Sequence, residues 1–184
     1  MKTNLEKKLS YVSGYRKYRI EVAEYILLNK EEFPTLLNLC FLDNKEISHK
    51  ACWVTEFVCK SNLTMIYPEL NYFIKNLASL TNDSSIRPMA KVCEILCESY
   101  FQKKNKESIS YLTEPLLEKL IEINFDWLIS DVKVATKAYA MRNLYLLGKK
   151  FDWIYPELKP ILLKDIPDHS AAYKARAKHI LDEI

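Results

Sequence analysis

The sequence predicts an all-α protein, a right-handed α-α superhelix of about four helix pairs that follows an N-terminal capping helix. Three observations predict this class. Segments led by a proline recur along the chain, an Asp or Asn recurs seven residues before an alanine, and apolar residues at helical spacing follow both. Glycine is also rare. Only Gly14 and Gly148 occur, which disfavours tight-turn strand folds and the glycine loops of nucleotide-binding folds.

The N-terminal segment, residues 1–30, is predicted to be the cap, with one helix from roughly Leu5 to Asn29. Ala23 and Ile26 give this helix the apolar stripe that the later helices also carry. A terminal repeat has a neighbour on only one side, so its other face must be polar. The charged residues of this segment suit that position.

A proline begins the first helix of each predicted pair. Residues 66–70 read Ile-Tyr-Pro-Glu-Leu and residues 154–158 read the same, while residues 113–117 and the weaker copy at 32–36 also centre on a proline. Proline is tolerated in a first helical turn because the backbone donors there have no intrahelical partner to lose. Each of these prolines therefore marks a helix start.

An Asp or Asn begins the second helix of each predicted pair. These side chains are strong N-caps because they accept hydrogen bonds from the first backbone NH groups of a helix. An alanine follows each of them by seven residues, at a position where two helices can approach closely. The four pairs are Asn44 and Ala51, Asp83 and Ala90, Asp131 and Ala138, and Asp168 and Ala175.

The two signatures together divide one domain, 1–184, into helix pairs. The predicted pairs are 31–60, 61–103, 104–149 and 150–184. The interval between the predicted caps Asp83 and Asp131 is longer than the intervals between the other caps. This locates an insertion in the polar stretch 102–107. We expect a lengthened turn or an extended helix end there, because such stretches are usually solvated loops.

The turns into the second helices resemble those of HEAT repeats, in which an Asp is followed six residues later by Arg or Lys. The pairs that show this spacing are Asp131 and Lys137, Asp168 and Lys174 and, less closely, Asn44 and Lys50. The copy at Asp83 departs from it, with Met89 at the basic position. Residues 134–148 look most like the second helix of that family. Over residues 30–184 the chain resembles the HEAT and armadillo class of α-solenoids, which implies an architecture and not a function.

The composition suits a folded domain of the cytoplasm. Hydrophobic residues make up 49% and charged residues 28% of the chain, and the net charge of +3 does not by itself indicate a nucleic-acid partner. No apolar run approaches the roughly 20 residues that span a bilayer. The charged N-terminus lacks a following apolar run, so no secretory signal is expected. The five cysteines are accordingly expected to be reduced and buried.

No metal, cofactor or catalytic group is expected. Cys93 and Cys97 lie at i and i+4 on one helix face, but a zinc site needs further ligands. The histidines His49, His169 and His179 are scattered, and no CxxC pair or nucleophile elbow occurs. The glycine-rich loop of helical lyases of the fumarase and adenylosuccinate type is also missing. The chain is therefore expected not to be an enzyme.

Basic residues of the second helices are the candidate binding residues of the concave face. They are Lys50, Arg87, Lys91, Lys133, Lys137, Arg142 and Lys174. Two interpretations remain open. The residues could bind phosphates or an acidic partner. Alternatively, the resemblance implies that the Asp and Lys residues of neighbouring repeats pair in a ladder that organises the stack.

Two functions follow from these expectations. The first is a non-enzymatic scaffold that binds a protein or peptide partner on its concave face. The alternative is a nucleic-acid-binding protein, or a DNA-alkylation-repair protein similar to the HEAT-like glycosylases. That comparison is prompted by twelve tyrosines together with Trp53, Trp127 and Trp153. Trp127 and Trp153 are also expected where aromatic side chains close helix hairpins by packing.

Overall fold

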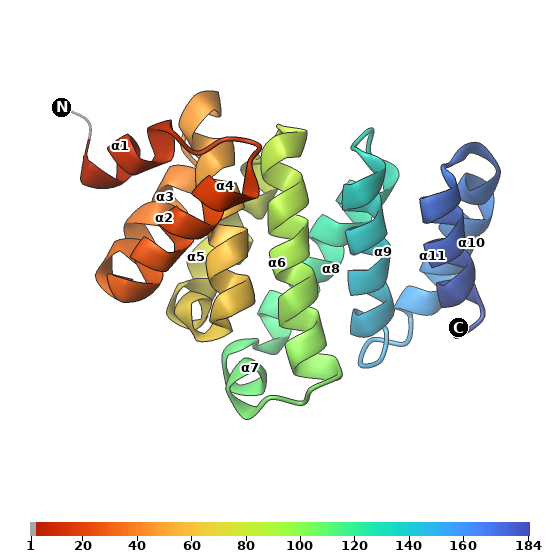
Figure 1. The fold of residues 1–184 in the computed structure, drawn as a ribbon. Coiled ribbons are helices and arrows are strands. Elements are labelled where there is room, and N and C mark those ends of the chain that lie inside the picture. Colours follow the sequence, from red (N-terminus) through yellow and green to blue (C-terminus); the bar gives the residue numbers. More distant parts are fainter. Residues whose placement is uncertain (1–2) are drawn as a thin grey trace. The chain divides into compact units, whose positions relative to one another are not determined.

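The computed structural model describes residues 3–184, in which eleven α-helices and four short 3-10 segments occur (Figure 1). This part of the chain confirms the predicted all-α class. The chain divides into two compact units, Met1–Ile95 and Leu96–Ile184, and each is described by itself. Met1 and Lys2, which belong to the segment where no secretory signal is expected, lie outside the described residues.

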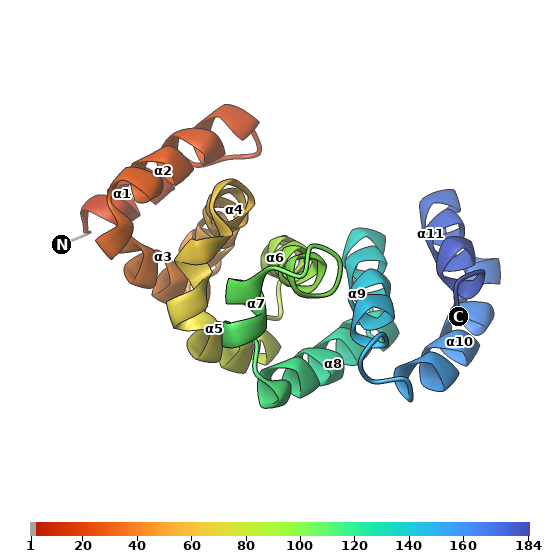
Figure 2. The same cartoon turned by 90° about the horizontal axis from the view of Figure 1, so that it is seen from below.

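The first unit is centred on α4, against which both α2 and α3 pack (Figure 2). Its elements are α1 Asn4–Ser10, α2 Arg16–Leu28, η1 Lys30–Glu32, α3 Phe33–Cys40, α4 Lys45–Ser61, η2 Leu63–Glu69, α5 Leu70–Asn76, η3 Leu77–Ser79 and the first part of α6 Asp83–Phe101.

The second unit is centred on α9, which contacts α8, α10 and α11. Its elements are the remainder of α6, α7 Lys106–Tyr111, α8 Glu114–Ile129, α9 Val134–Leu147, α10 Ile154–Asp165, η4 Ile166–Asp168 and α11 Ala171–Leu181. The helix pairs α8–α9 and α10–α11 correspond to the last two predicted pairs.

The predicted single helix from Leu5 to Asn29 is wrong, because the structure divides it at residues 11–15. Gly14 lies in this break, and glycine is a weaker helix former than the residues around it. Val12 turns inward there and is buried. The Nε of Arg19 donates a hydrogen bond to the carbonyl oxygen of Ser13 at 3.0 Å, which ties the break to α2.

The prolines mark the starts of first helices as predicted, with one difference. Pro34 and Pro115 stand at the first positions of α3 and α8, and Pro156 lies in the first turn of α10. Pro68 instead lies inside the 3-10 segment η2, and α5 begins two residues later at Leu70. Pro68 therefore lies past the first turn of η2 and does not mark a helix start in the way the other three prolines do.

The predicted N-cap of α4 is confirmed, and that of α6 moves by one residue. The Oδ1 of Asn44 accepts hydrogen bonds from the backbone NH groups of Glu46 at 3.1 Å and Ile47 at 3.3 Å. At α6 the capping side chain is Asn82, whose Oδ1 accepts from the backbone NH of Ser84 at 2.8 Å. Asp83 is the first helical residue instead.

The predicted caps Asp131 and Asp168 are wrong, because each lies two residues before the N-cap position of its helix. The residue that stays extended directly before α9 is Lys133, and the one before α11 is Ser170. The Oγ of Ser170 accepts a hydrogen bond from the backbone NH of Tyr173 at 3.4 Å. Ser is itself a strong N-cap, so it replaces Asp168 in this role.

The later helix starts shift the register of the small residues by two positions. Ala51 and Ala90 are fully buried as predicted. Ala138 is half-buried and Ala175 is exposed, so these two predictions are wrong. The fully buried alanines of α9 and α11 are Ala140 and Ala177.

The insertion is a turn followed by the short helix α7. Lys104 takes a left-handed φ of 50° in the turn. The Oδ1 of Asn105 caps α7 by accepting from the backbone NH of Ser108 at 3.0 Å. The buried hydroxyls of Ser99 and Ser108 hydrogen-bond at 2.5 Å, so α7 is fastened to the end of α6.

The end of α9 approaches Tyr155 too closely for a side chain. A Cβ on Gly148 would lie 2.1 Å from the Cε1 of Tyr155. The Tyr155 hydroxyl donates to the carbonyl oxygen of Tyr145 at 3.2 Å, and the two rings stack with their centroids 6.3 Å apart. Glycine at this position therefore allows the turn between α9 and α10 to close.

We predict that Gly148→Ala destabilises the protein by about 1–3 kcal/mol, because the added methyl group must displace the Tyr155 ring. Urea denaturation followed by circular dichroism measures this change. The matched control is Gly14→Ala, where an added Cβ meets nothing within 4 Å, and its stability should stay within about 0.5 kcal/mol. Equal effects of the two variants would contradict the prediction.

The corrected register predicts that Ala140→Glu lowers the free energy of unfolding by several kcal/mol. The substitution would place a carboxylate where the structure leaves 0% exposure. Thermal and urea denaturation measure the loss. Ala175→Glu, on an exposed position, serves as the control and should change little. A larger loss for Ala138→Glu than for Ala140→Glu would restore the register inferred from the sequence.

Candidate functional site

The candidate site of the first unit is built around the buried carboxylate of Glu56 on α4. Its side chain is 3% exposed, and Lys60 one turn later forms an ion pair with it. The Nη2 of Arg87, on α6, lies 2.8 Å from the Glu56 Oε2. A buried carboxylate is retained only when cations and hydrogen bonds compensate its desolvation. Glu56 thereby fixes two basic side chains from two helices.

A second guanidinium lies beside this cluster. The Arg19 guanidinium stands over the Trp53 ring, 4.0 Å from its centroid, and its Nε is held by the Ser13 carbonyl oxygen. Burial and then the positive charge of Arg87 lower the pKa of Arg19 from its ordinary value, while Glu56 opposes the shift. Arg19 nevertheless remains cationic, because arginine does not lose its proton in proteins. Glu56 thus pairs with Arg87 and acts on Arg19 through its charge.

Further aromatic and charged side chains extend this surface. His49 meets Trp53 edge to face, with centroids 4.7 Å apart. The Arg16 guanidinium lies 5.8 Å from the centroid of the Phe57 ring. We call the whole surface the Arg19 face. Its members are Arg16 and Arg19 on α2, His49, Trp53, Glu56, Phe57 and Lys60 on α4, and Arg87, Lys91 and Glu94 on α6.

Cations outnumber carboxylates on the Arg19 face. Lys91 and the buried Glu94 form an ion pair, as Lys60 and Glu56 do. Arg16, Arg19 and Arg87 add further positive charge, so the named members of the face carry an excess of cations over the two carboxylates, Glu56 and Glu94. Aromatic rings under guanidiniums hold the charges in place and keep them partly accessible.

The seven basic residues predicted from the sequence divide into three groups in the structure. Arg87 and Lys91 belong to the Arg19 face. Lys50 and Lys174 bind backbone carbonyl groups instead, at Ser10 and Pro167 respectively, with distances of 2.8 and 3.1 Å. The remaining three, Lys133, Lys137 and Arg142, lie on α9 or directly before it.

The predicted ladder of Asp and Lys pairs is therefore replaced by lysine-to-carbonyl contacts at Lys50 and Lys174. Ser10 is the last residue of α1, and the carbonyl groups at a helix C-terminus attract cations. The Lys50 side chain is 13% exposed, so it is directed mainly at this contact. In the second unit Lys137 is buried, Lys133 is exposed, and Arg142 stands 5.2 Å from the centroid of the Tyr145 ring.

Arg16, Arg19 and Glu56 were not among the binding residues predicted from the sequence. A signal for them existed, because Arg16 and Arg19 are spaced to share one face of a helix, and Trp53, Glu56 and Lys60 share another. Their convergence depends on α2 packing against α4 and on the break that precedes α2. Neither feature is visible in the spacing of one helix.

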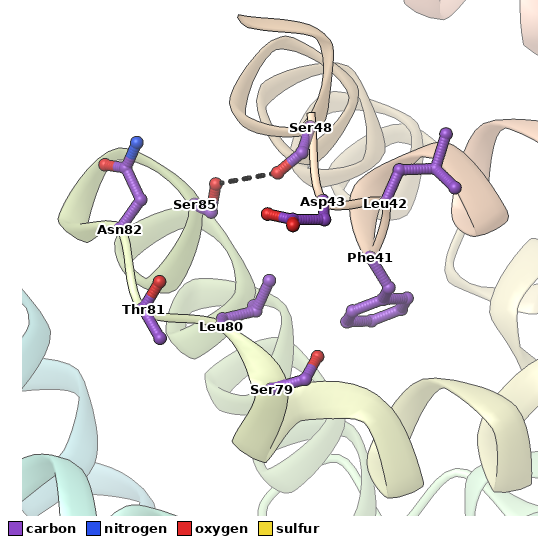
Figure 3. A pocket seen from close by; sticks show the side chains of 9 residues that line it. All are labelled: Phe41, Leu42, Asp43, Ser48, Ser79, Leu80, Thr81, Asn82 and Ser85. Atoms are coloured by element: carbon purple, nitrogen blue, oxygen red, sulfur yellow. Dashed lines mark hydrogen bonds between the residues drawn. The ribbon is translucent and has the colours of Figure 1, made fainter. Parts of the chain in front are cut away.

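The first unit also contains a polar pocket of about 290 Å³ between the α3–α4 turn and the segment leading into α6 (Figure 3). The hydroxyls of Ser48 and Ser85 hydrogen-bond at 3.3 Å, and the Asp43 carboxylate points into the space beside them. The other lining residues are Phe41, Leu42, Ser79, Leu80, Thr81 and Asn82. The pocket offers hydrogen bonds and one negative charge to a small molecule.

The described residues, 3–184, form neither a metal site nor a membrane span. This part of the chain has no group of three His, Cys, Asp or Glu side chains placed to hold a metal ion. No helix within it is long and apolar enough to cross a membrane. All five cysteines are buried, as predicted, and burial raises the thiol pKa of Cys52 and Cys59.

Successive helix pairs with buried second helices define an α-helical repeat protein. The family model of the HEAT repeat domain matches residues 5–184, and the chain therefore belongs to the HEAT repeat family. The resemblance noted in the sequence is thus confirmed over nearly the whole chain. No curated protein and no solved structure matches the chain with significance.

We predict that Glu56→Gln lowers the free energy of unfolding by about 1–3 kcal/mol. The change removes the carboxylate that Arg87 and Lys60 share, and it leaves Arg19 and Arg87 to repel each other. Urea denaturation measures the loss. Glu46→Gln is the control, because the Glu46 side chain is 80% exposed and its ion pair should contribute little. Similar stabilities of the two variants would count against a structural role for Glu56.

Proposed function

We propose that this HEAT repeat protein is a non-enzymatic scaffold whose Arg19 face binds an acidic segment of a protein partner. The observation that carries the proposal is the placement of Arg19. Its guanidinium is fixed between the Trp53 ring and the Ser13 carbonyl. Burial and then the nearby Arg87 guanidinium lower the pKa of Arg19, while the Glu56 carboxylate pairs with Arg87. Such a site has positive charge left to offer a ligand.

Carboxylates are the ligands that suit this arrangement. A guanidinium presents a planar set of donors that matches a carboxylate, and a guanidinium already stacked on an indole loses little freedom on binding. Arg16 and Arg19 lie one helical turn apart on α2, which spaces them for successive acidic side chains of a peptide. Charge complementarity of this kind favours association rate and specificity.

The second candidate function is nucleic-acid binding, because phosphates also pair with arginine. The observed geometry favours it less. Stacking of a base on Trp53 would compete with Arg19 on the ring face and with His49 at the ring edge. Glu56, the carboxylate that base-excision chemistry would need on this face, is buried and paired with Lys60 and Arg87. The peptide interpretation therefore takes precedence.

The other predicted basic residues receive separate roles in this proposal. Lys133 and Arg142 are proposed as further partner contacts in the second unit, because both retain exposure. Lys50 and Lys174, which bind backbone carbonyls, and Lys137, which is buried, are proposed to stabilise the fold.

We predict that the protein binds a fluorescent poly-glutamate peptide, and that Arg19→Glu weakens binding at least about tenfold. Fluorescence anisotropy at low salt measures both, and added salt should weaken the interaction because exposed charges are screened. Lys75→Glu, on an exposed residue of α5 outside the Arg19 face, makes the same charge change and should bind nearly as wild type.

A second titration, with a single-stranded DNA oligonucleotide of equal charge, separates the two candidate functions. Tighter binding of the oligonucleotide, lost in Arg19→Glu, would replace the peptide proposal with the nucleic-acid one. Equal poly-glutamate affinity of Arg19→Glu and Lys75→Glu would exclude the Arg19 face as the binding site.

A further inference from the structure

The second unit contains a groove on α8 that none of the preceding roles explains. Its volume is about 330 Å³, and it lies between α8 and the turn that leads into α10. Its lining residues are Glu118, Ile121, Glu122, Phe125 and Trp153. Apart from Ile121, each lining residue carries either an aromatic ring or a carboxylate.

The aromatic wall of the groove is formed by Trp153 and Phe125. Their rings are nearly parallel, inclined by 20°, with centroids 6.4 Å apart. Trp153 is 52% exposed, whereas Trp127 of the neighbouring turn of α8 is 5% exposed and belongs to the core. An indole that is held against a second ring and still presents half of its surface is suited to stacking with a ligand.

The negative charge of the groove comes from the carboxylates of α8. Glu114, Glu118, Glu122 and Asp126 follow one another at four-residue spacing, and all four are exposed. Like charges at this spacing destabilise a helix slightly, so the row has a small energetic cost. Lys150 pairs with Glu114 at 2.7 Å, and Lys119 pairs with Glu122. Within residues 3–184 the Glu118 side chain forms no such ion pair.

We infer that the groove receives an arginine side chain from a basic segment of a partner protein. The planar guanidinium stacks on the exposed face of Trp153 and pairs with the Glu118 carboxylate, with Glu122 one turn further along. The row of α8 carboxylates attracts the flanking basic residues of the segment. Nucleic acid is excluded as the occupant because its phosphates would face these carboxylates.

This inference is independent of the proposed function of the Arg19 face. The α8 groove lies in the other unit, it has the opposite charge, and it requires a ligand that the Arg19 face would repel. Two surfaces of opposite charge could also bring two copies of the chain together, so the experiment below includes self-association as an outcome.

We test the inference by fluorescence anisotropy with labelled poly-arginine, using the whole chain. Wild type should bind it, and Trp153→Ala and Glu118→Gln should each weaken binding about tenfold, while Trp153→Phe retains part of the affinity. Glu107→Gln, which removes an exposed carboxylate of α7 outside the groove, is the matched control and should bind as wild type. Poly-lysine should bind more weakly than poly-arginine, because an ammonium group does not stack.

Three results would overturn the inference. Undiminished binding by Trp153→Ala would remove the groove from the interaction, and an equal loss in Glu107→Gln would show attraction to charge without a site. Concentration-dependent dimers, measured by analytical ultracentrifugation, that Trp153→Ala abolishes and poly-arginine does not dissociate would make a second copy the occupant. Arg19→Glu should keep poly-arginine binding while it loses poly-glutamate binding, so failure of one proposal leaves the other testable.

Discussion

Burial of the second helices α4, α6 and α9 is the constraint on which both units depend. In α9 the residues Ala140, Met141, Leu144 and Leu147 are all buried, and α8, α10 and α11 contact the helix from different sides. A helix with so much apolar surface is stable only when its neighbours cover it. One polar side chain carried inward on α9 is paired there, since the Asn143 Nδ2 donates to the Oδ1 of Asn124 on α8 at 2.8 Å.

The same constraint places carboxylates differently in the two units, with Glu56 buried in the first unit and those of α8 exposed in the second. In the first unit a carboxylate, Glu56, is carried inward on α4, and it draws Lys60 and Arg87 toward the surface that the second helices form. In the second unit the carboxylates of α8, a first helix, remain outside and give the α8 groove its negative charge. The two units therefore carry surfaces of opposite charge.

Periodicity along the chain predicted the helix pairs but not the details of their ends. Proline in a first turn is a local signal, and it located the starts of α3, α8 and α10. The N-cap is the residue with extended backbone directly before the helix. For α9 and α11 that residue is Lys133 and Ser170, so the two helices begin later than Asp131 and Asp168 predicted. The Arg19 face and the α8 groove join residues from separate helices, such as Arg19 with Trp53 and Phe125 with Trp153. Their contacts depend on helix packing, which no spacing within one helix encodes.

Because all five cysteines are buried, their rate of reaction with a thiol reagent reports how often the surrounding helices separate. A thiol reacts with an alkylating or oxidising reagent as the exposed thiolate, and burial both hides the sulfur atoms and raises the thiol pKa of Cys52 and Cys59. Modification must therefore wait until the surrounding helices separate. The three cysteines of α3 and α4, namely Cys40, Cys52 and Cys59, would then report the local unfolding of the first unit, because reagents that reach only the surface of the folded chain leave these thiols unmodified.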